Sequence, residues 1–323
     1  MDDLLQPLIN GDRRALSRAI TLVESTRPDH RREAQDLIAR LPDRQALRIG
    51  LSGTPGVGKS TFIEAFGTNL TDQGNSVAVL AVDPSSARSG GSILGDKTRM
   101  EHLARNPRAF IRPSPSNTQL GGVALRTREA VRLCEAAGYD IIVIETVGVG
   151  QSETLVADMS DLFILLLAPA GGDELQGVKR GIMEMADLVL VNKADGDLMS
   201  PARRTVADYA GALRLLRKRP QDPEGFPKAM PVSAATGLGL PEAWDQMQQL
   251  ADWRRQHGHF DRNRAEQARH WFWAELRAGL MARLDRPEVK ARIEELGGQV
   301  AQGQLPAAFA AQQVLDWLEG PSQ

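Results

Sequence analysis

The chain has 323 residues and a formal net charge of −2, with 42% hydrophobic and 25% charged residues. This is the composition of an ordinary globular protein, and it gives no electrostatic reason to expect binding to nucleic acid or to an anionic membrane. Cys134 is the only cysteine, which excludes an internal disulfide and fits a reducing compartment. The acidic start, Met-Asp-Asp-Leu, lacks the basic residues of a targeting peptide, and the most apolar stretch, residues 162–168, is too short to span a bilayer. We therefore expect a cytoplasmic protein that does not enter the membrane.

The first 45 residues have the spacing of two amphipathic helices and form a predicted helical extension, with a break near Arg27-Pro28-Asp29. From residue 47 onward, short apolar runs alternate with longer helical patterns. The apolar runs cover residues 47–51, 77–82, 109–112, 141–144, 162–167, 188–191 and 229–232. Runs such as residues 141–144 are apolar at every position, which is typical of strands buried on both faces of a parallel sheet. The sequence therefore predicts a doubly wound α/β domain with a mostly parallel sheet over residues 46–255.

After Trp253 the strand pattern stops, and residues 260–284, 286–297 and 306–319 have the spacing of three helices. They make up a second predicted helical extension, at residues 256–323. The first of these helices carries a set of large apolar side chains: Trp271, Phe272, Trp273, Leu276, Leu280 and Leu284. These side chains either pack on the α/β domain of the same chain or form a dimer arm, because aromatic residues are enriched at interfaces. The sequence alone leaves both interpretations open.

Residues 53–60 read Gly-Thr-Pro-Gly-Val-Gly-Lys-Ser and match the phosphate-binding pattern G-x-x-x-x-G-K-[ST] at every fixed position. Glycines let backbone N–H groups turn toward the phosphates, and the helix that follows adds its positive dipole end. Lys59 is expected to reach the β- and γ-phosphates, and the Ser60 hydroxyl to coordinate Mg²⁺. A glycine-rich turn without a ligand is the alternative, which the flanking strand and helix patterns disfavour. The predicted nucleotide-binding residues here are Gly53, Thr54, Pro55, Gly56, Val57, Gly58, Lys59, Ser60 and Thr61.

The identity of the base is indicated by Asn192-Lys193-Ala194-Asp195, which follows a buried-type strand at residues 188–191. The Asp195 carboxylate can accept hydrogen bonds from the ring N–H and the amino group of guanine, whereas adenine presents an acceptor at the ring position. We expect Lys193 to lie along the base and Asn192 to tie this loop to the phosphate loop. Residues Ser233, Ala234 and Ala235 end the next strand and are expected to offer a backbone N–H to the guanine carbonyl. Together these features predict GTP, with GDP as the product.

Acidic residues at strand ends are candidates for Mg²⁺ and for the attacking water. Glu145 opens Glu-Thr-Val-Gly where many GTPases have D-x-x-G, so we expect it to hold Mg²⁺ and the N–H of Gly148 to contact the γ-phosphate. Asp83 closes the strand at residues 77–82 and either serves the metal or caps a turn before the following proline. Asp96 ends a glycine-rich loop that suits a first switch. Lys59, Asp83, Asp96, Glu145 and Gly148 are the predicted catalytic residues, and Ser60, Asp83, Asp96 and Glu145 the predicted metal ligands.

The residue after Gly148 is Val149, where Ras-like proteins have the glutamine that orients water; Gln151 is displaced by two positions. We therefore predict slow intrinsic hydrolysis that accelerates when a partner or a second subunit completes the site. A further glycine-bearing loop at residues 169–180 follows the strand at residues 162–167. It is either a plain surface connection or a nucleotide-sensitive loop that reports to a partner.

These motifs together resemble the MeaB/ArgK family of GTPases. The resemblance rests on the phosphate loop, on the strings D-P-S-S, G-G-S-I-L-G-D and E-T-V-G-V-G-Q-S-E at residues 83–86, 90–96 and 145–153, and on residues 192–195. It covers nearly the whole chain, including both helical extensions.

The resemblance implies a homodimer joined by the C-terminal helices. It also implies that GTP binding and hydrolysis gate the delivery of adenosylcobalamin to methylmalonyl-CoA mutase and protect that enzyme from inactivation. Gln176 and Lys179, in a third switch, are then the expected contacts with the mutase. The D-x-H-x-x-G string of base-off cobalamin carriers is absent from the sequence, so we expect no cobalamin on this chain itself.

Three other functions compete with this prediction. A metal-insertion GTPase usually needs clusters of cysteine and histidine, which a single cysteine and five scattered histidines disfavour. A kinase acting on a small molecule or on a transport-system protein usually needs ATP, which residues 192–195 disfavour. A purely structural module leaves a complete nucleotide site without a purpose.

Overall fold

The computed structural model describes residues 2–82, 100–113, 120–146, 152–169, 180–216 and 219–319. The chain divides into two compact units, Met1–Arg264 and Ala265–Gln323. The first unit contains the sheet together with the N-terminal helices, and the second is helical.

Within the described residues, seven parallel strands form one sheet in the order β3-β2-β4-β1-β5-β6-β7. The strands are β1 (Leu47–Ser52), β2 (Val77–Val82), β3 (Ala109–Arg112), β4 (Ile141–Thr146), β5 (Leu162–Leu167), β6 (Leu188–Val191) and β7 (Lys228–Pro231). The strand order reverses around β1, and open α/β sheets bind ligands beside the carboxyl ends of strands at such a point. The predicted parallel α/β fold is therefore confirmed, and the sheet positions a ligand site at the end of β1.

Strand β4 is two residues longer than predicted. Its register pairs Glu145 with Leu51 of β1 and with Ala81 of β2, and Thr146 pairs with Val82. Backbone pairing on both sides thus carries the strand past its apolar run, because the hydrogen bonds of a central strand do not depend on side-chain polarity. Strand β7 also differs by one residue at each end from the predicted run.

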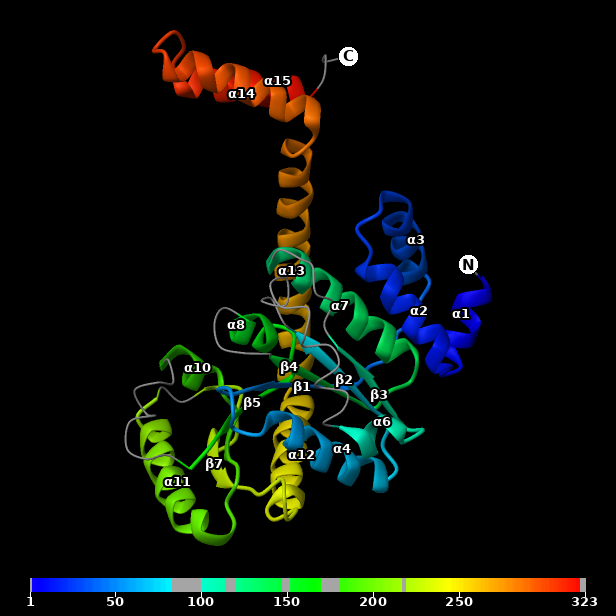
Figure 1. The fold of residues 1–323 in the computed structure, drawn as a ribbon. Coiled ribbons are helices and arrows are strands. Elements are labelled where there is room, and N and C mark those ends of the chain that lie inside the picture. The colour runs from blue at the N-terminus through cyan, green and yellow to red at the C-terminus, as the bar shows by residue number, and fades with distance from the viewer. Residues whose placement is uncertain are drawn as a thin grey trace. The chain divides into compact units, whose positions relative to one another are not determined.

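Helices cover both faces of the sheet: α4 (Lys59–Asp72), α6 (Glu101–Arg105), α7 (Leu120–Ala136), α8 (Ser152–Ala157), α10 (Arg180–Met185), α11 (Met199–Arg214) and α12 (Leu240–Gln256), with the 3₁₀ helix η2 (Gly196–Leu198). In Figure 1, α4 and α12 lie on one side of the sheet and α7 and α8 on the other. No helix in the described ranges is both long enough and apolar enough to cross a membrane.

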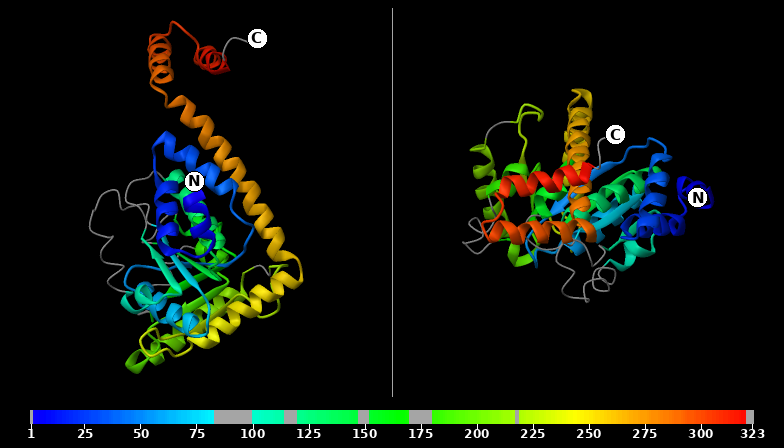
Figure 2. Two further views of the ribbon diagram at one scale, coloured as in Figure 1. Left: turned by 90° about the vertical axis from the view of Figure 1, so that its right-hand side faces the viewer. Right: turned by 90° about the horizontal axis from the view of Figure 1, so that it is seen from above.

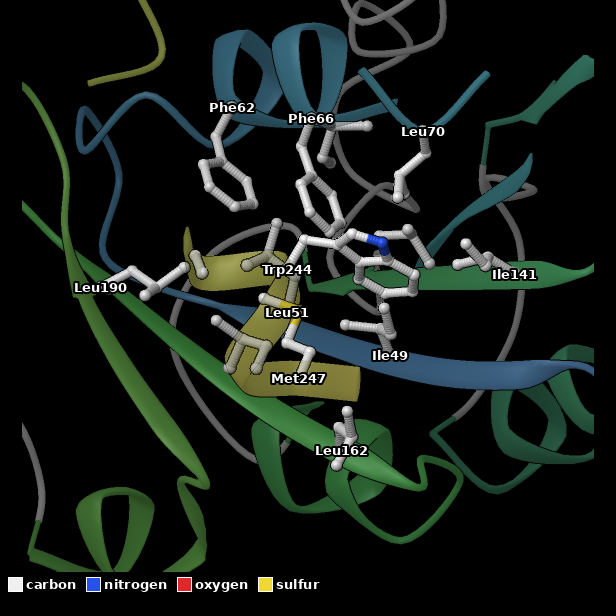
Figure 3. Packing of buried hydrophobic residues seen from close by; sticks show 14 of the residues in the cluster. Ile49, Leu51, Phe62, Phe66, Leu70, Ile141, Leu162, Leu190, Trp244 and Met247 are labelled. Carbon is white, nitrogen blue, oxygen red and sulfur yellow. The ribbon is translucent and has the colours of Figure 1, made fainter. Parts of the chain in front are cut away.

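Alternate residues of β1 face the two helical layers. Ile49 and Leu51 pack in the core with Phe66 of α4 and Trp244 of α12, as Figure 3 shows. The ring centroids of Phe66 and Trp244 lie 5.9 Å apart in an edge-to-face arrangement. Gly50 points to the other layer, where an added Cβ would lie 2.4 Å from the Ser160 hydroxyl. The same Cβ would lie 2.9 Å from the Val156 side chain of α8, so the close approach of α8 to the sheet depends on a residue without a side chain.

Three N-terminal helices, and not the predicted two, precede the sheet: α1 (Asp2–Ile9), α2 (Arg13–Glu24) and α3 (Pro28–Ala39). The extra break lies at Gly11, whose φ of +82° ends α1, and Asp12 then caps α2 by accepting a 2.7 Å hydrogen bond from the Ala15 N–H. These helices lie beside α7, as the views in Figures 1 and 2 show. Arg31 forms a bidentate pair with Glu129 of α7, at 2.8 and 3.0 Å.

The second unit holds the last part of α13 (His259–Leu284), together with α14 (Pro287–Ala301) and α15 (Ala307–Glu319). The helices α14 and α15 share a small core of Val289, Leu296, Ala310 and Val314. Helix α14 continues four residues beyond its predicted end, through Gly297-Gly298, because Val300 packs against this core. Large apolar side chains remain exposed in the unit: Phe272, Trp273, Leu276, Leu280, Met281, Ile293, Phe309, Leu315 and Trp317.

Candidate nucleotide-binding site

The glycine-rich loop connects the carboxyl end of β1 to the start of α4 at Lys59. Gly56 and Gly58 have φ angles of +85° and +90°, in the left-handed region where residues with a Cβ are strained. These conformations let the loop curl back at the first turn of α4. The Lys59 ammonium folds over this curl and donates to the Gly53 carbonyl at 2.7 Å. A concave loop with a lysine across it at a helix N-terminus is suited to binding phosphate.

Close packing leaves no room for a side chain at the first glycine of the loop. A Cβ on Gly53 would lie 2.3 Å from the Leu166 carbonyl oxygen of β5 and 3.1 Å from the Val57 side chain. A Cβ on Gly58 would lie 2.9 Å from the Asn192 amide nitrogen. The loop therefore touches β5 and the loop after β6, and both glycines permit that contact.

The Gly53→Ala variant is expected to bind GTP at least about tenfold more weakly, because the loop must move away from a backbone carbonyl that β5 holds in place. Titration with a fluorescent guanine nucleotide measures the change. Gly211→Ala in α11 is the matched control, since a Cβ there meets no atom within 4 Å and alanine favours a helix. Equal affinities of the two variants would show that the loop tolerates the displacement.

Two side chains join the loop after β6 to the phosphate loop. The Asn192 amide donates to the Val57 carbonyl at 2.9 Å, and its oxygen accepts from the Ala234 N–H at 3.0 Å. The Lys193 ammonium donates to the Gly56 carbonyl at 2.8 Å. Lys193 has a φ of +59°, a rare conformation for a residue with a side chain. The link that the sequence predicts for Asn192 is present, and the contact of Lys193 adds a second one.

Asp195 follows these residues and is the N-cap of η2. Its carboxylate accepts a hydrogen bond from the hydroxyl of Ser233, which is fully buried. Asp195 also lines an open hollow of about 560 Å³, whose other walls include Gly196, Met199 and Thr236. A carboxylate fixed by a buried hydroxyl at the rim of a hollow is suited to accept hydrogen bonds from a heterocyclic base.

Of residues 233–235 after β7, one leaves its backbone N–H without a hydrogen-bond partner in the described part of the chain, because the N–H of Ser233 donates to the Leu238 carbonyl. The N–H of Ala234 is used by Asn192, and the N–H of Thr236 donates to the Ser233 hydroxyl at 3.2 Å. Ala235 lies between them and is exposed. Its N–H is therefore the candidate donor to a guanine carbonyl among the three residues that the sequence singles out.

Glu145 lies in β4 between the ends of β1 and β2 and is only 4% exposed. Next to it, the Thr146 hydroxyl donates to the Ser52 hydroxyl at 3.1 Å. Together with Ser60 in the first turn of α4, this edge offers carboxylate and hydroxyl oxygens, which are the ligands that Mg²⁺ prefers. The oxygen ligands available at this edge of the sheet thus fit a magnesium site.

Several predicted site residues lie outside the described residues. They are Asp83, Asp96 and Gly148, together with the partner-contact candidates Gln176 and Lys179. Their assignments stay predictions from the sequence.

Sequence reasoning missed Ser52 and Thr236. Ser52 stands directly before Gly53 and supports the strand end beside Glu145 through Thr146. Thr236 directly follows the predicted Ser-Ala-Ala segment and lines the hollow beside Asp195. Their positions next to recognised motifs are the signal that was available in the sequence.

A parallel sheet with a glycine-rich phosphate loop after β1 and an Asn-Lys-x-Asp loop after β6 defines the class of P-loop GTPases. The comparison with protein families shows which family of that class the chain belongs to. The family described as "Methylmalonyl Co-A mutase-associated GTPase MeaB" matches residues 16–288, so the chain belongs to the MeaB family and is a GTP hydrolase. The resemblance seen in the sequence is thereby confirmed.

Relatives with near-complete coverage support the assignment. A "Putative GTPase" from Caulobacter vibrioides is 52% identical over 98% of this chain and 97% of the relative. The "Methylmalonic aciduria type A homolog, mitochondrial" from Mus musculus is 49% identical over 98% of this chain and 79% of the relative. A crystal structure titled "LAO/AO transport system kinase" has a TM-score of 0.74 and 34% identity, and the match covers 98% of this chain and 97% of that one.

Proposed function

We propose that this GTPase is a chaperone that uses its nucleotide cycle to gate adenosylcobalamin loading into methylmalonyl-CoA mutase and to protect that enzyme. Membership of the MeaB family supports the choice of client. The observation that carries the nucleotide cycle is the pair of bonds from Asn192 and Lys193 to the phosphate loop. These bonds hold the base-binding and phosphate-binding loops together as one guanine-nucleotide site, and the γ-phosphate contact expected of Gly148 would distinguish GTP from GDP.

In the proposed nucleotide complex, Lys59 exchanges its bond to the Gly53 carbonyl for the β- and γ-phosphates. The N–H groups of the loop then cradle the phosphates, and Asp195 accepts from the guanine ring N–H and amino group. Ala235 donates its N–H to the guanine carbonyl. These residues bind and orient GTP, and hydrolysis yields GDP and phosphate.

We propose that Mg²⁺ is held by Ser60 and Glu145, with Asp83 and Asp96 as the further ligands that the sequence predicts. When bound, the metal neutralises charge on the β- and γ-phosphates. Glu145 suits this role because its carboxylate is buried at the strand ends beside the phosphate loop. The proposal involves no cobalamin bound by this chain itself, and cobalamin absorbance after gel filtration with the cofactor tests that.

The C-terminal unit is proposed to form a homodimer. Exposed side chains such as Phe272, Trp273 and Trp317 supply apolar and aromatic area of the kind found at interfaces. Sedimentation equilibrium should give twice the monomer mass at micromolar concentration. A monomer mass throughout that range would contradict the proposal.

The function is tested by measuring phosphate release from GTP and from ATP, with and without purified adenosylcobalamin-dependent methylmalonyl-CoA mutase. The expected result is slow release that is selective for GTP and that the mutase accelerates by about tenfold or more, by completing the site. Lys59→Ala serves as the background control.

If the mutase does not change the rate of phosphate release from GTP, the proposed client is rejected and the metal-insertion alternative is favoured. Appearance of a phosphorylated product in place of free phosphate would instead indicate a kinase. The cytoplasmic location stays a prediction from the sequence, which fractionation of the cells that make the protein tests.

A further inference from the structure

A second cavity lies away from the nucleotide loops, between the start of α2 and the carboxyl end of β3. It has a volume of about 280 Å³ and is lined by three arginines, Arg13, Arg14 and Arg112, and by apolar residues that include Phe110 and Ile111. Pockets for drug-sized ligands span roughly 300–1,000 Å³, so this cavity suits a compact ligand. Its walls combine positive charge with an aromatic and aliphatic surface.

Two of the three guanidinium groups are already fixed by the protein. Arg13 donates to the Asn106 carbonyl at 3.2 Å and to the Ala104 carbonyl at 3.4 Å. Arg112 pairs with Glu24 through Nε and Nη2, and its Nη2 also donates to the Thr21 hydroxyl at 3.1 Å. A guanidinium has five N–H donors, so both side chains keep donors for a ligand. Because they are held in place, binding to them costs little side-chain entropy.

Arg14 completes the group. It is exposed and makes no hydrogen bond or ion pair with any residue that the structure describes. Of the nearby carboxylates, Glu24 is neutralised by Arg112, and Asp12 caps α2 through the Ala15 N–H. Three guanidinium groups against these two carboxylates leave a net positive charge at the cavity, which favours an anion.

The cavity is independent of the nucleotide site. Strand β3 stands three strands away from β1 in the sheet, which is roughly 14 Å at the usual strand spacing. Like the nucleotide site, the cavity lies beside the carboxyl ends of the strands, where α/β sheets bind ligands. None of the residues that line it is assigned to the phosphate loop, the base loop or the magnesium site.

We propose that this arginine cavity binds a small molecule that carries a phosphate group on an apolar body. The phosphate accepts hydrogen bonds from Arg13, Arg14 and Arg112, since guanidinium groups match phosphate oxygens in pairs. The apolar body of the ligand packs on Phe110, Ile111 and Pro113. A partly open hollow of this size with an apolar wall favours such a molecule over an acidic segment of a protein, which a flat charged surface would serve.

The test is isothermal titration calorimetry with phenyl phosphate, on full-length protein saturated with a non-hydrolysable GTP analogue so that the phosphate loop is filled. Inorganic phosphate and a hexaglutamate peptide are titrated in parallel. We expect phenyl phosphate to bind more tightly than inorganic phosphate, because of the apolar wall. Arg14→Gln should weaken phenyl phosphate binding about tenfold.

Arg18→Gln is the matched control, because Arg18 is an exposed arginine one turn further along α2 and does not line the cavity. Its affinity for phenyl phosphate should equal that of the unmodified protein. Arg14 is exposed and makes no hydrogen bond or ion pair within the described residues, so we expect its replacement to leave the fold intact. Equal weakening by both substitutions, absence of binding, or tighter binding of hexaglutamate than of phenyl phosphate would each overturn the proposal.

Discussion

The Asp195→Asn variant is expected to lose its preference for GTP and to hydrolyse xanthosine triphosphate better than GTP. An aspartate accepts two hydrogen bonds from the ring N–H and amino group of guanine. Asparagine can accept only one of them, and it presents its own N–H₂ to the guanine amino group. In xanthine that amino group is replaced by a carbonyl, which accepts a hydrogen bond from the asparagine amide.

The expected loss for GTP is about 100-fold or more in kcat/KM, because each hydrogen bond to a charged group contributes about 1.5–3 kcal/mol. Ser233 supports the test, since its hydroxyl donates to the Asp195 side chain and an asparagine oxygen accepts the same bond. The variant should therefore keep the loop in place, and the change should affect base selection.

Steady-state phosphate release with GTP, ATP and xanthosine triphosphate measures this prediction. Asp197→Asn is the matched control, because Asp197 is an exposed carboxylate two residues further along the same loop. Its nucleotide preference should not change. If Asp195→Asn still prefers GTP over xanthosine triphosphate, then Asp195 does not read the base.

The sheet was predictable because buried parallel strands have a strong signal in the sequence. Runs that are apolar at every position gave the bounds of β2, β5 and β6 without error, and the predicted bounds of β3, whose last residue is Arg112, also agree. The phosphate and base loops were predictable because the conformations and donors they need leave few residue choices, as at Gly58 and Asn192. Local chemistry was enough in both cases.

Other features depend on long-range contacts that no local pattern reveals. The end of β4 at Thr146 is set by pairing with β1 and β2, and the extra helix break depends on the left-handed conformation of Gly11. The arginine cavity joins residues about 90 positions apart in the chain, as the bond of Arg112 to Glu24 illustrates. The buried ion pairs of Arg254 near the amino ends of β5 and β6 likewise have no local pattern that predicts them.

The second large effect is expected from Arg254 of α12, at the edge of the sheet opposite the nucleotide site. This side chain is 10% exposed and donates to Asp187 at 2.6 Å, to Asp222 at 2.7 Å and to the Asp161 carbonyl at 2.7 Å. Asp161 and Asp187 directly precede β5 and β6, so Arg254 joins α12 to the starts of two strands. Arg219 also pairs with Asp187, at 2.7 Å.

Arg254→Met is expected to reduce the free energy of unfolding by about 3–5 kcal/mol, because it leaves buried carboxylates without their main cation. For a unit of this size we expect the melting temperature to fall by roughly 10 °C in differential scanning calorimetry. The control is Arg255→Met at the next position, where the ion pair with Asp252 is largely exposed. That change should cost at most about 1 kcal/mol. Equal losses in the two variants would mean that the buried network does not stabilise the fold.

The loss in Arg254→Met should depend on pH in a defined direction. Burial raises the pKa of Asp222 above its usual value, and Arg254 opposes that rise. Without the arginine the pKa rises further, so the folded variant binds a proton more tightly than the unfolded chain does. Stability then increases as the pH falls toward the raised pKa, since the native state binds more protons. The deficit of the variant relative to the unmodified protein should therefore be smaller at about pH 5 than at about pH 8, and a deficit that grew on acidification would contradict this account.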